Sequence, residues 1–129
     1  MEYRQLDEKE IRQLEDNNCW AEDWQRVMVA DDFNPNAVRN VTFYGDVKLG
    51  SFDKSIEVSK TFMRRTGVYN ATLRNVTIGN NSLVENVGNY INNYVIGSDC
   101  YISNICTMET TEGATYGEGN IISVLNEVG

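Results

Sequence analysis

The residue types that most often carry catalytic chemistry are scarce in this chain. It has 129 residues, no histidine and three cysteines, Cys19, Cys100 and Cys106. The cysteines lack the Cys-x-x-Cys spacing of a zinc site, and their odd number does not suit a disulfide framework. A cysteine nucleophile is normally activated by a histidine, which this chain cannot supply. The sequence therefore predicts no catalytic residue, no metal site and no cofactor.

One set of polar residues could still support transfer chemistry without histidine. It combines carboxylate, phenol and amide groups in one part of the chain, at Glu85, Asn86, Tyr90, Tyr94 and Asn104. A glutamate or tyrosine in such a set could take the place of histidine as a general base. These five residues are the candidate ligand-binding residues of a transferase hypothesis, in which the site lies at a boundary between subunits.

The basic residues gather in one segment, residues 54–65, which includes Lys60, Arg64 and Arg65. Because this segment departs from the repeat described below, we expect a loop that leaves the main structure. Runs of charge are usually solvated surface, and that is the plain interpretation here. The functional interpretation is an arm that reaches an anionic ligand or a neighbouring subunit, with Arg64 and Arg65 as ligand-binding residues.

Pairs of acidic residues are a further source of acid–base or cation-binding chemistry. The pairs are Glu109 with Glu112 and Glu118 with Glu127. Nothing in their spacing makes the carboxylates converge, so solvated side chains are the better interpretation.

The overall charge narrows the classes of partner. The formal net charge is −8, which argues against nucleic acid and against an anionic membrane surface, since both require basic residues. The first residues are polar and include no apolar signal segment, and no apolar run is long enough to span a bilayer. Together with cysteines that suit a reducing compartment, these features predict a cytoplasmic protein.

The elements that must position these side chains differ between the start of the chain and the remainder. Asp7 followed by Glu10 is a capping-box pattern for a helix, and Asn17-Asn18 is a plausible helix end. Trp20, Trp24 and Val27 then recur at helical spacing. We expect residues 1–36 to form a short helical cap, with the two tryptophans docked on the remaining structure.

From residue 37 onward, strand-forming residues dominate, and residues 78–113 divide into six-residue blocks. The first place of each block is large and apolar, occupied by Ile78, Val84, Tyr90, Ile96, Ile102 and Met108. The fifth place is small in four of the six blocks, occupied by Ser82, Gly88, Tyr94, Cys100, Cys106 and Glu112. This regularity indicates a repeat architecture.

A longer, 18-residue period lies above the six-residue one. The segment at positions 83–87 recurs at positions 101–105, so Val84 should lie beside Ile102 and Asn86 beside Asn104. A third copy, around positions 121–125, begins later than this period requires, which predicts two inserted residues near positions 110–115. An earlier echo pairs positions 39–43 with positions 74–78.

Three six-residue sides that close a triangle would produce both periods. The large residue of each block would point inward, and asparagine or glycine at the corners would tolerate positive φ. The sequence predicts an all-β fold, a left-handed parallel β-helix with 18-residue coils over residues 37–129, behind a short α-helical N-terminal cap. A β-sandwich is the main alternative, but its strands would not keep a six-residue phase.

This pattern resembles the hexapeptide-repeat superfamily, which includes acyltransferases and the C-terminal domains of nucleotide-sugar pyrophosphorylases. The whole chain is similar to the N-terminal region of large uncharacterised bacterial proteins labelled sugar-nucleotide pyrophosphorylase-like or transferase-like. The matching stretches are residues 1–6 (MEYRQL), 21–24 (AEDW), 85–87 (ENV), 89–91 (NYI) and 123–127 (SVLNE).

The resemblance implies self-association, as a trimer or dimer, and a nucleotide sugar or acyl-coenzyme A as ligand. Two departures limit it, because the chain lacks the general-base histidine of the acyltransferases and the glycine-rich nucleotide loop of the pyrophosphorylases. We therefore expect a scaffold, oligomerisation or ligand-platform segment that is not catalytic on its own. The alternatives are the transferase described above and a fragment of an enzyme whose catalytic domain lies elsewhere.

Overall fold

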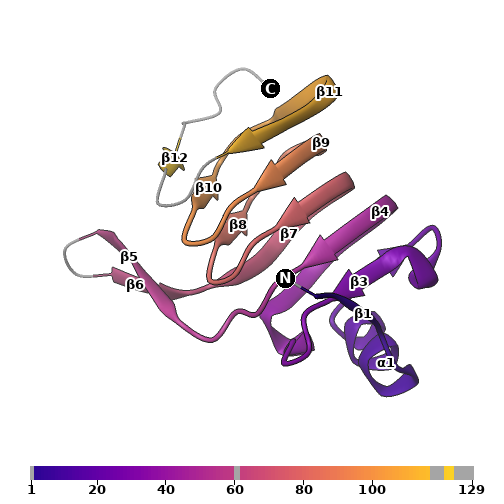
Figure 1. The fold of residues 1–129 in the computed structure, drawn as a ribbon. Coiled ribbons are helices and arrows are strands. Elements are labelled where there is room, and N and C mark those ends of the chain that lie inside the picture. Colours follow the sequence, from indigo (N-terminus) through magenta and orange to yellow (C-terminus); the bar gives the residue numbers. More distant parts are fainter. Residues whose placement is uncertain (1, 60–61, 117–120, 124–129) are drawn as a thin grey trace.

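The computed structural model describes residues 2–59, 62–116 and 121–123, which are mostly β (Figure 1). In chain order the elements are β1 (Arg4–Gln5), α1 (Glu8–Asp16), β2 (Trp20–Ala21), η1 (Trp24–Arg26), β3 (Val27–Val29), η2 (Pro35–Ala37), β4 (Val38–Leu49), β5 (Ser55–Ser59), β6 (Phe62–Arg65), β7 (Gly67–Ile78), β8 (Leu83–Glu85), β9 (Tyr90–Ile96), β10 (Tyr101–Ser103), β11 (Thr107–Tyr116) and β12 (Ile121–Ser123). Within these ranges, no helix is long and apolar enough to cross a bilayer.

The N-terminal helix forms as its capping signal predicts. The Asp7 side chain accepts a hydrogen bond from the Glu10 backbone N–H at 2.8 Å, and the Glu10 side chain accepts one from the Asp7 N–H at 3.0 Å. Both otherwise unsatisfied donors of the first turn are thereby paired. Helix α1 ends at Asp16 with Asn17 as its C-cap, and Asn18 follows with a φ of 64°, which confirms the predicted end.

The expectation that Trp20, Trp24 and Val27 share a helical face is wrong. Trp20 lies on strand β2, Trp24 begins the short 3-10 helix η1, and Val27 begins strand β3. Strands β2 and β3 both pair in parallel with β4. The parallel sheet therefore starts inside the segment expected to be a helical cap, because pairing with β4 outweighs a periodicity carried by only three residues.

The main sheet is built from parallel strands in matched register. Strand β8 pairs with β10 and β7 pairs with β9 at the predicted 18-residue spacing, which places Val84 opposite Ile102 and Ile78 opposite Ile96. In Figure 1, β4, β7, β9 and β11 lie side by side, and β8, β10 and β12 form a second row. The repeat is thus confirmed as a strand register. The antiparallel pairing of β1 with β3 makes the sheet mixed.

The predicted core residues share one interior. Ile78, Val84, Ile96 and Ile102 are fully buried and belong to the same apolar cluster. Tyr90 departs from the pattern, because it is only half-buried while its neighbour Ile91 is fully buried. Strand β9 therefore turns Ile91 inward, opposite Leu73 of β7, and leaves the Tyr90 side chain on the outer face.

Bends in the backbone occur at asparagine. Eight asparagines and Asp99 have a positive φ among the described residues, a conformation that asparagine tolerates better than most residues. Five of these asparagines form a side-chain ladder of Nδ2 to Oδ1 hydrogen bonds. The steps are Asn18 to Asn40 (2.8 Å), Asn40 to Asn70 (2.9 Å), Asn70 to Asn86 (3.0 Å) and Asn86 to Asn104 (3.4 Å). The predicted proximity of Asn86 and Asn104 is confirmed.

In the main sheet the register shifts twice among the described residues, between Tyr44 and Val47 of β4 and within β11, and sequence reasoning located the second shift. The pairing of β11 with β9 shifts between Glu109 and Ala114, and Tyr101 of β10 pairs with Ile121 of β12, as the displaced third copy predicted. The echo between positions 39–43 and 74–78 is a repeat of environment and not of strand pairing. Asn40 and Asn75 both have a positive φ, and the two segments share one pattern of burial, but Val41 pairs with Ala71. The hairpin inserted between β4 and β7 lengthens that repeat and obscures the register.

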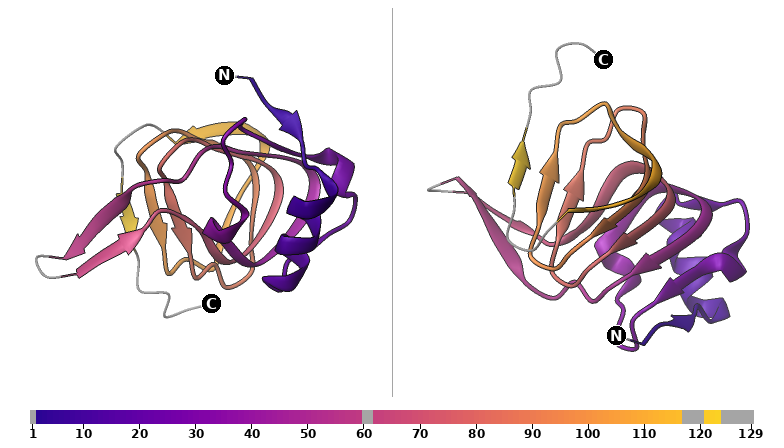
Figure 2. Two further views of the ribbon diagram at one scale, coloured as in Figure 1. Left: turned by 90° about the horizontal axis from the view of Figure 1, so that it is seen from below. Right: turned by 45° about the horizontal axis from the view of Figure 1, so that its top comes forward.

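The basic segment is a hairpin, whereas a loop was expected. Strands β5 and β6 pair antiparallel as a separate two-stranded sheet, which projects from the parallel strands (Figure 2). At its base, the Thr66 N–H and hydroxyl both donate to the carbonyl of Lys54, at 2.8 Å and 2.7 Å. The prediction that this segment leaves the main structure is confirmed.

Candidate ligand-binding face

The sequence-predicted site residues fall into separate groups. Glu85 meets Arg64 beneath the hairpin, whereas Asn86 and Asn104 belong to the asparagine ladder. Tyr90 lines an open groove. Within one chain, these residues therefore do not gather around one site.

Two further candidates lie away from these groups. Tyr94 is half-buried and packs against the core, opposite Val76. Arg65 is exposed at the end of β6, where its Nη2 donates to the Phe52 carbonyl at 3.5 Å.

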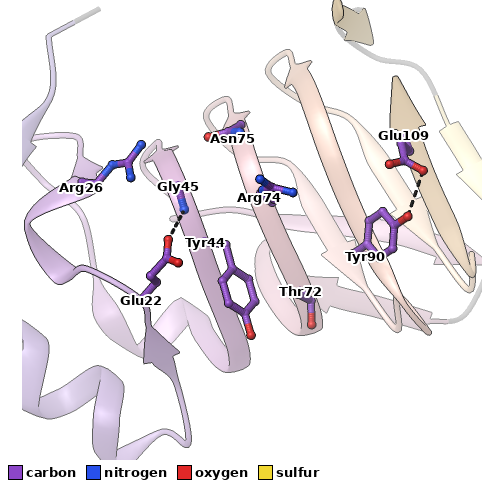
Figure 3. Close-up of a pocket in the computed structure, with 9 residues that line it drawn as sticks. All are labelled: Glu22, Arg26, Tyr44, Gly45, Thr72, Arg74, Asn75, Tyr90 and Glu109. Atoms are coloured by element: carbon purple, nitrogen blue, oxygen red, sulfur yellow. Dashed lines mark hydrogen bonds between the residues drawn. The ribbon is translucent and has the colours of Figure 1, made fainter. Parts of the chain in front are cut away.

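The groove lies on the outer face of the row β4, β7, β9 and β11 and has a volume of about 510 Å³ (Figure 3). Its lining is polar and aromatic, contributed by Glu22, Arg26, Tyr44, Gly45, Thr72, Arg74, Asn75, Tyr90 and Glu109. Successive side chains of a strand point to opposite faces. Because Phe43, Leu73 and Ile91 face the core, their neighbours in each strand must face outward.

Arg74 is the cation available in this groove. Its side chain is exposed, and it makes no ion pair or side-chain hydrogen bond to any residue that the structure describes. Arg26, by contrast, is committed to Asp46, with Nε 2.9 Å from Oδ1. That hydrogen bond lowers the pKa of Asp46. Arg74 can therefore offer its full set of guanidinium donors to a bound anion.

The carboxylate at the far end of the groove is held in place by two neighbours. Glu109 accepts a hydrogen bond from the Tyr90 hydroxyl at 2.9 Å and another from Asn92 Nδ2 at 3.4 Å. The bond to Glu109 raises the pKa of Tyr90, so the phenol keeps its proton at neutral pH. Asn92 is buried, and its Oδ1 has no hydrogen-bond partner among the described residues.

The opposite end of the groove is shaped by a glycine. Gly45 has a φ of +64°, and a Cβ built there would lie 2.2 Å from Asn75 Oδ1. That same oxygen accepts a hydrogen bond from the Asp46 N–H at 3.0 Å. A side chain at position 45 would therefore displace Asn75 as well as strain the backbone. Beside this end, the exposed Trp20 ring packs edge-on against Tyr44, with 5.7 Å between ring centres.

The second group, around Glu85, lies on a different stretch of the outer face and is covered. Val84 and Ile102 face the core, so Glu85 and Ser103 point outward, yet both are buried. Arg64 of β6 lies over them, with Nη1 2.9 Å from Glu85 Oε1. The Tyr101 and Ser103 hydroxyls each donate to Glu85 Oε2 at 3.1 Å.

Aromatic rings complete this covered cluster. The guanidinium of Arg64 lies 5.6 Å from the centre of the Tyr69 ring, within the range of a cation–π contact. Burial raises the pKa of both Tyr69 and Tyr101, which keeps both phenols protonated and able to donate. Glu85 is therefore engaged by the protein itself and is closed to a ligand.

Sequence reasoning found Tyr90 but missed the other groove residues, notably Tyr44, Thr72 and Arg74. The available signal was strand alternation, because positions 41–44 and 71–74 each read as apolar and polar in turn. Without the register between β4 and β7, these two segments could not be placed side by side. In the ranges that the structure describes, no group of three or more His, Cys, Asp or Glu residues could hold a metal ion.

The fold and the groove define a class: a mostly β chain with parallel strands in register and a polar, ligand-sized face on the outside of its sheet. The chain belongs to the family described as a domain of unknown function, DUF4954, which matches residues 3–129.

Comparison with curated proteins found an uncharacterized protein of Treponema pallidum (strain Nichols), 31% identical over 119 residues. The match covers 92% of this chain and 16% of that relative, so the chain spans a small part of the relative's length. No solved structure matches the chain.

Proposed function

We propose that this chain is a left-handed parallel β-helix of 18-residue coils that serves as a scaffold and ligand platform within a longer protein and is not catalytic by itself. The 18-residue register between β7 and β9 and between β8 and β10 supports the coil. The ladder of left-handed asparagines supports a corner that repeats once per coil. The small share of the relative that this chain covers supports a role inside a larger molecule.

The observation that carries the platform role is the groove around Arg74. Neighbouring strands of a sheet lie about 4.8 Å apart, so side chains from β4, β7 and β9 stand in fixed, evenly spaced rows. A rigid array of this kind can orient a ligand without changing shape. A free guanidinium at its centre gives the array one strong point of recognition.

The ligand classes proposed for this platform are nucleotide sugars and acyl-coenzyme A. Both carry phosphate, which an unpaired arginine binds well. We also propose that the chain self-associates as a dimer or trimer, because β-helices of the superfamily it resembles assemble side by side. Analytical ultracentrifugation tests this second point, and a monomer at micromolar concentration would refute it.

The transferase alternative gains little from the groove. Tyr90 and Glu109 are a phenol–carboxylate pair beside Arg74, the arrangement that a histidine-free general base would need. The pKa of Tyr90 is raised, so the phenol is not a base near neutral pH, and Glu109 already accepts two hydrogen bonds. These facts favour a binding role for the pair.

A thermal-shift panel with nucleotide sugars and acyl-coenzyme A tests the platform. A ligand at a hundredfold excess over its Kd should stabilise the chain by about 2.7 kcal/mol. Arg74→Ala should reduce the stabilisation to about half or less, while the matched control Arg12→Ala, in the exposed part of α1, should retain it. If no member of the panel shifts the wild-type transition, the platform role for these ligands is refuted.

The coil itself is tested by an experimental structure of the same chain. A left-handed path from β7 through β8 to β9, with three walls per coil, would support the proposal. A right-handed path, or a flat sheet with the same pairings, would overturn the fold and leave the groove to be explained in another way.

A further inference from the structure

We infer that the groove binds an acidic oligosaccharide, a short chain of sugars that carries carboxylate or phosphate groups. This inference rests on the proposed platform role and names the ligand of that site. It starts from the direction in which the groove runs, which is across the strands and along the stack of parallel strands (Figure 3).

The length of this surface suits several sugar units. From Trp20 on β2 to Glu109 on β11, the surface crosses five consecutive paired strands, β2, β4, β7, β9 and β11. At about 4.8 Å per interval, the span is roughly 19 Å. A single sugar or a lone anion would occupy only part of it, whereas three or four linked sugars would fill it.

The side chains along this path are those that recognise sugars. Tyr44 and Tyr90 present half-buried rings, and a ring of this type offers an apolar face for sugar C–H groups and a polar edge for hydroxyls. Trp20 extends the aromatic surface beyond Tyr44. From the residues that the structure describes, Glu22 accepts one long hydrogen bond, from the Gly45 N–H at 3.4 Å, so its carboxylate can accept further bonds from hydroxyls.

The acidic character of the sugar follows from Arg74. Two arginines of the described ranges line the groove. Arg26 is paired with Asp46, whereas the guanidinium of Arg74 has no side-chain partner among the described residues. A carboxylate or phosphate on the central sugar would pair with it in a forked geometry. Glu22, which directly follows β2, and Glu109 on β11 line the groove on either side of Arg74, so uncharged parts of the ligand should lie over them. The groove therefore fits one anionic group near its centre.

A peptide is a poorer fit to the same surface. Peptides bind sheets mainly by adding a strand to an exposed edge or by placing apolar anchors in pockets. Strands β4, β7 and β9 each have a partner on both sides, so these three strands offer no free edge. Among the described residues, no aliphatic side chain lines the groove. Exposed rings and polar groups without an apolar pocket favour a hydroxyl-rich ligand.

Isothermal titration of the full 129-residue chain with the trisaccharide GlcNAc–GlcA–GlcNAc, which carries one carboxylate on its central sugar, and with maltotriose and inorganic phosphate tests the inference. The acidic trisaccharide should bind, maltotriose should bind at least tenfold more weakly, and phosphate should bind more weakly still. Arg74→Ala should reduce the affinity for the acidic trisaccharide by about 10- to 100-fold, the loss of one charge-assisted contact. Arg12→Ala should leave it unchanged.

The aromatic contribution is tested separately by Tyr44→Ala, with Tyr44→Phe as its conservative partner. Tyr44→Ala should weaken binding of the acidic trisaccharide about fivefold or more, and Tyr44→Phe should restore most of it, because the ring face is retained. Circular dichroism of each variant before titration separates a lost contact from a lost fold.

Each result has a distinct meaning for the two proposals. Phosphate binding as tightly as the acidic trisaccharide would overturn the saccharide and leave a simple anion site. Binding of a nucleotide sugar in the thermal-shift panel, without binding of the acidic trisaccharide, would overturn this inference but leave the platform intact. Equal binding of maltotriose and the acidic trisaccharide would overturn the acidic requirement. Failure of all three titration probes would overturn this inference, and the platform falls as well only if the nucleotide sugars and acyl-coenzyme A also give no thermal shift.

Discussion

Two outward-facing regions of the same parallel sheet put arginine to opposite uses. Under the hairpin, Arg64 pairs with Glu85, whose carboxylate also accepts hydrogen bonds from Tyr101 and Ser103. In the open groove, Arg74 projects into solvent and makes no such contact within the described ranges. What differs is the cover, since the hairpin buries one stretch of outer face and leaves the other open.

The comparison shows how an insertion can divide one repeated surface into a structural part and a binding part. A carboxylate can be buried on an outer face only if the covering element brings the cation and donors that replace water. A solvent-exposed arginine can remain without an ion-pair partner at little cost in free energy, because water solvates its charge. The hairpin β5–β6 supplies Arg64, and no described element supplies an equivalent partner to Arg74.

The largest loss of stability is expected from Arg64→Ala, in the region that the hairpin covers. Arg64→Ala leaves the carboxylate of Glu85, which is 4% exposed, without its cation. Removing one partner of a buried ion pair costs roughly 3–5 kcal/mol. Since 35% of the Arg64 side chain is exposed, we expect the lower end, about 3 kcal/mol, measured as the shift of the urea midpoint.

The neighbouring substitution Arg65→Ala is the matched control for Arg64→Ala. Arg65 is exposed on the same hairpin and makes one long contact to a carbonyl, so its loss should cost less than about 0.5 kcal/mol. Equal urea midpoints for the two variants would show that Glu85 does not depend on the hairpin for its cation, and the comparison between the regions would fail.

The second-largest loss of stability is expected from substitutions of Asn86, at the bend that separates the two regions. Asn86 directly follows Glu85, has a φ of 55° and joins Asn70 to Asn104 in the ladder. Asn86→Ala should cost about 2 kcal/mol, from a strained left-handed residue and lost hydrogen bonds. Asn86→Gly, which tolerates the conformation, should cost about 1 kcal/mol. If thermal denaturation gives the same loss for both, backbone strain is not what asparagine relieves here.

The third loss of stability is expected from Glu10→Gln, which breaks the partly exposed ion pair between Arg4 and Glu10. The hydrogen bond from Arg4, at 2.8 Å, and the backbone bond of the capping box lower the pKa of Glu10. A carboxylate with a lowered pKa in the folded state stabilises at neutral pH, and this contribution is lost as the pH falls through the folded pKa. Glu10→Gln should therefore cost about 1 kcal/mol at pH 7 and little at pH 3.

The control for that pH dependence is Glu8→Gln on the same helix. Glu8 is exposed and lies 3.7 Å from Arg12 across one turn, a surface pair of little worth. Stability curves from pH 3 to pH 7 should separate the two variants only above the acidic range. Parallel curves would mean that the capping box does not hold the charge of Glu10.

The repeat could be predicted from the sequence because positions in equivalent environments of the fold carry similar residue types. Ile78, Val84, Ile96 and Ile102 could be assigned to one interior, and Asn86 to a place beside Asn104, from spacing alone. Sequence reasoning failed where pairing partners are distant in the chain. Trp20 and Val27 form strands only because β4 lies beside them, and that neighbour cannot be inferred from a local pattern.

The site was harder to foresee than the fold for a related reason. Tyr44 and Arg74 come from strands whose alignment depends on the length of the inserted hairpin, whereas Tyr90 lies on a strand aligned with β7 by the 18-residue register. A register error of one residue would turn each of them to the opposite face. At Tyr90 the six-residue pattern made this error, because it placed the ring in the interior, whereas the ring lines the groove.

The smallest effect on stability is expected from Arg74→Ala, and it completes the comparison. The side chain is exposed and has no ion pair within the described ranges, so its removal should change the free energy of unfolding by less than about 0.5 kcal/mol. The identical substitution at Arg64 should cost several times more, because there the carboxylate that remains is buried. Urea unfolding of both variants under the same conditions provides the measurement. A large loss at Arg74 would mean that this arginine holds the fold together, and the groove would then lack the free cation on which a binding role depends.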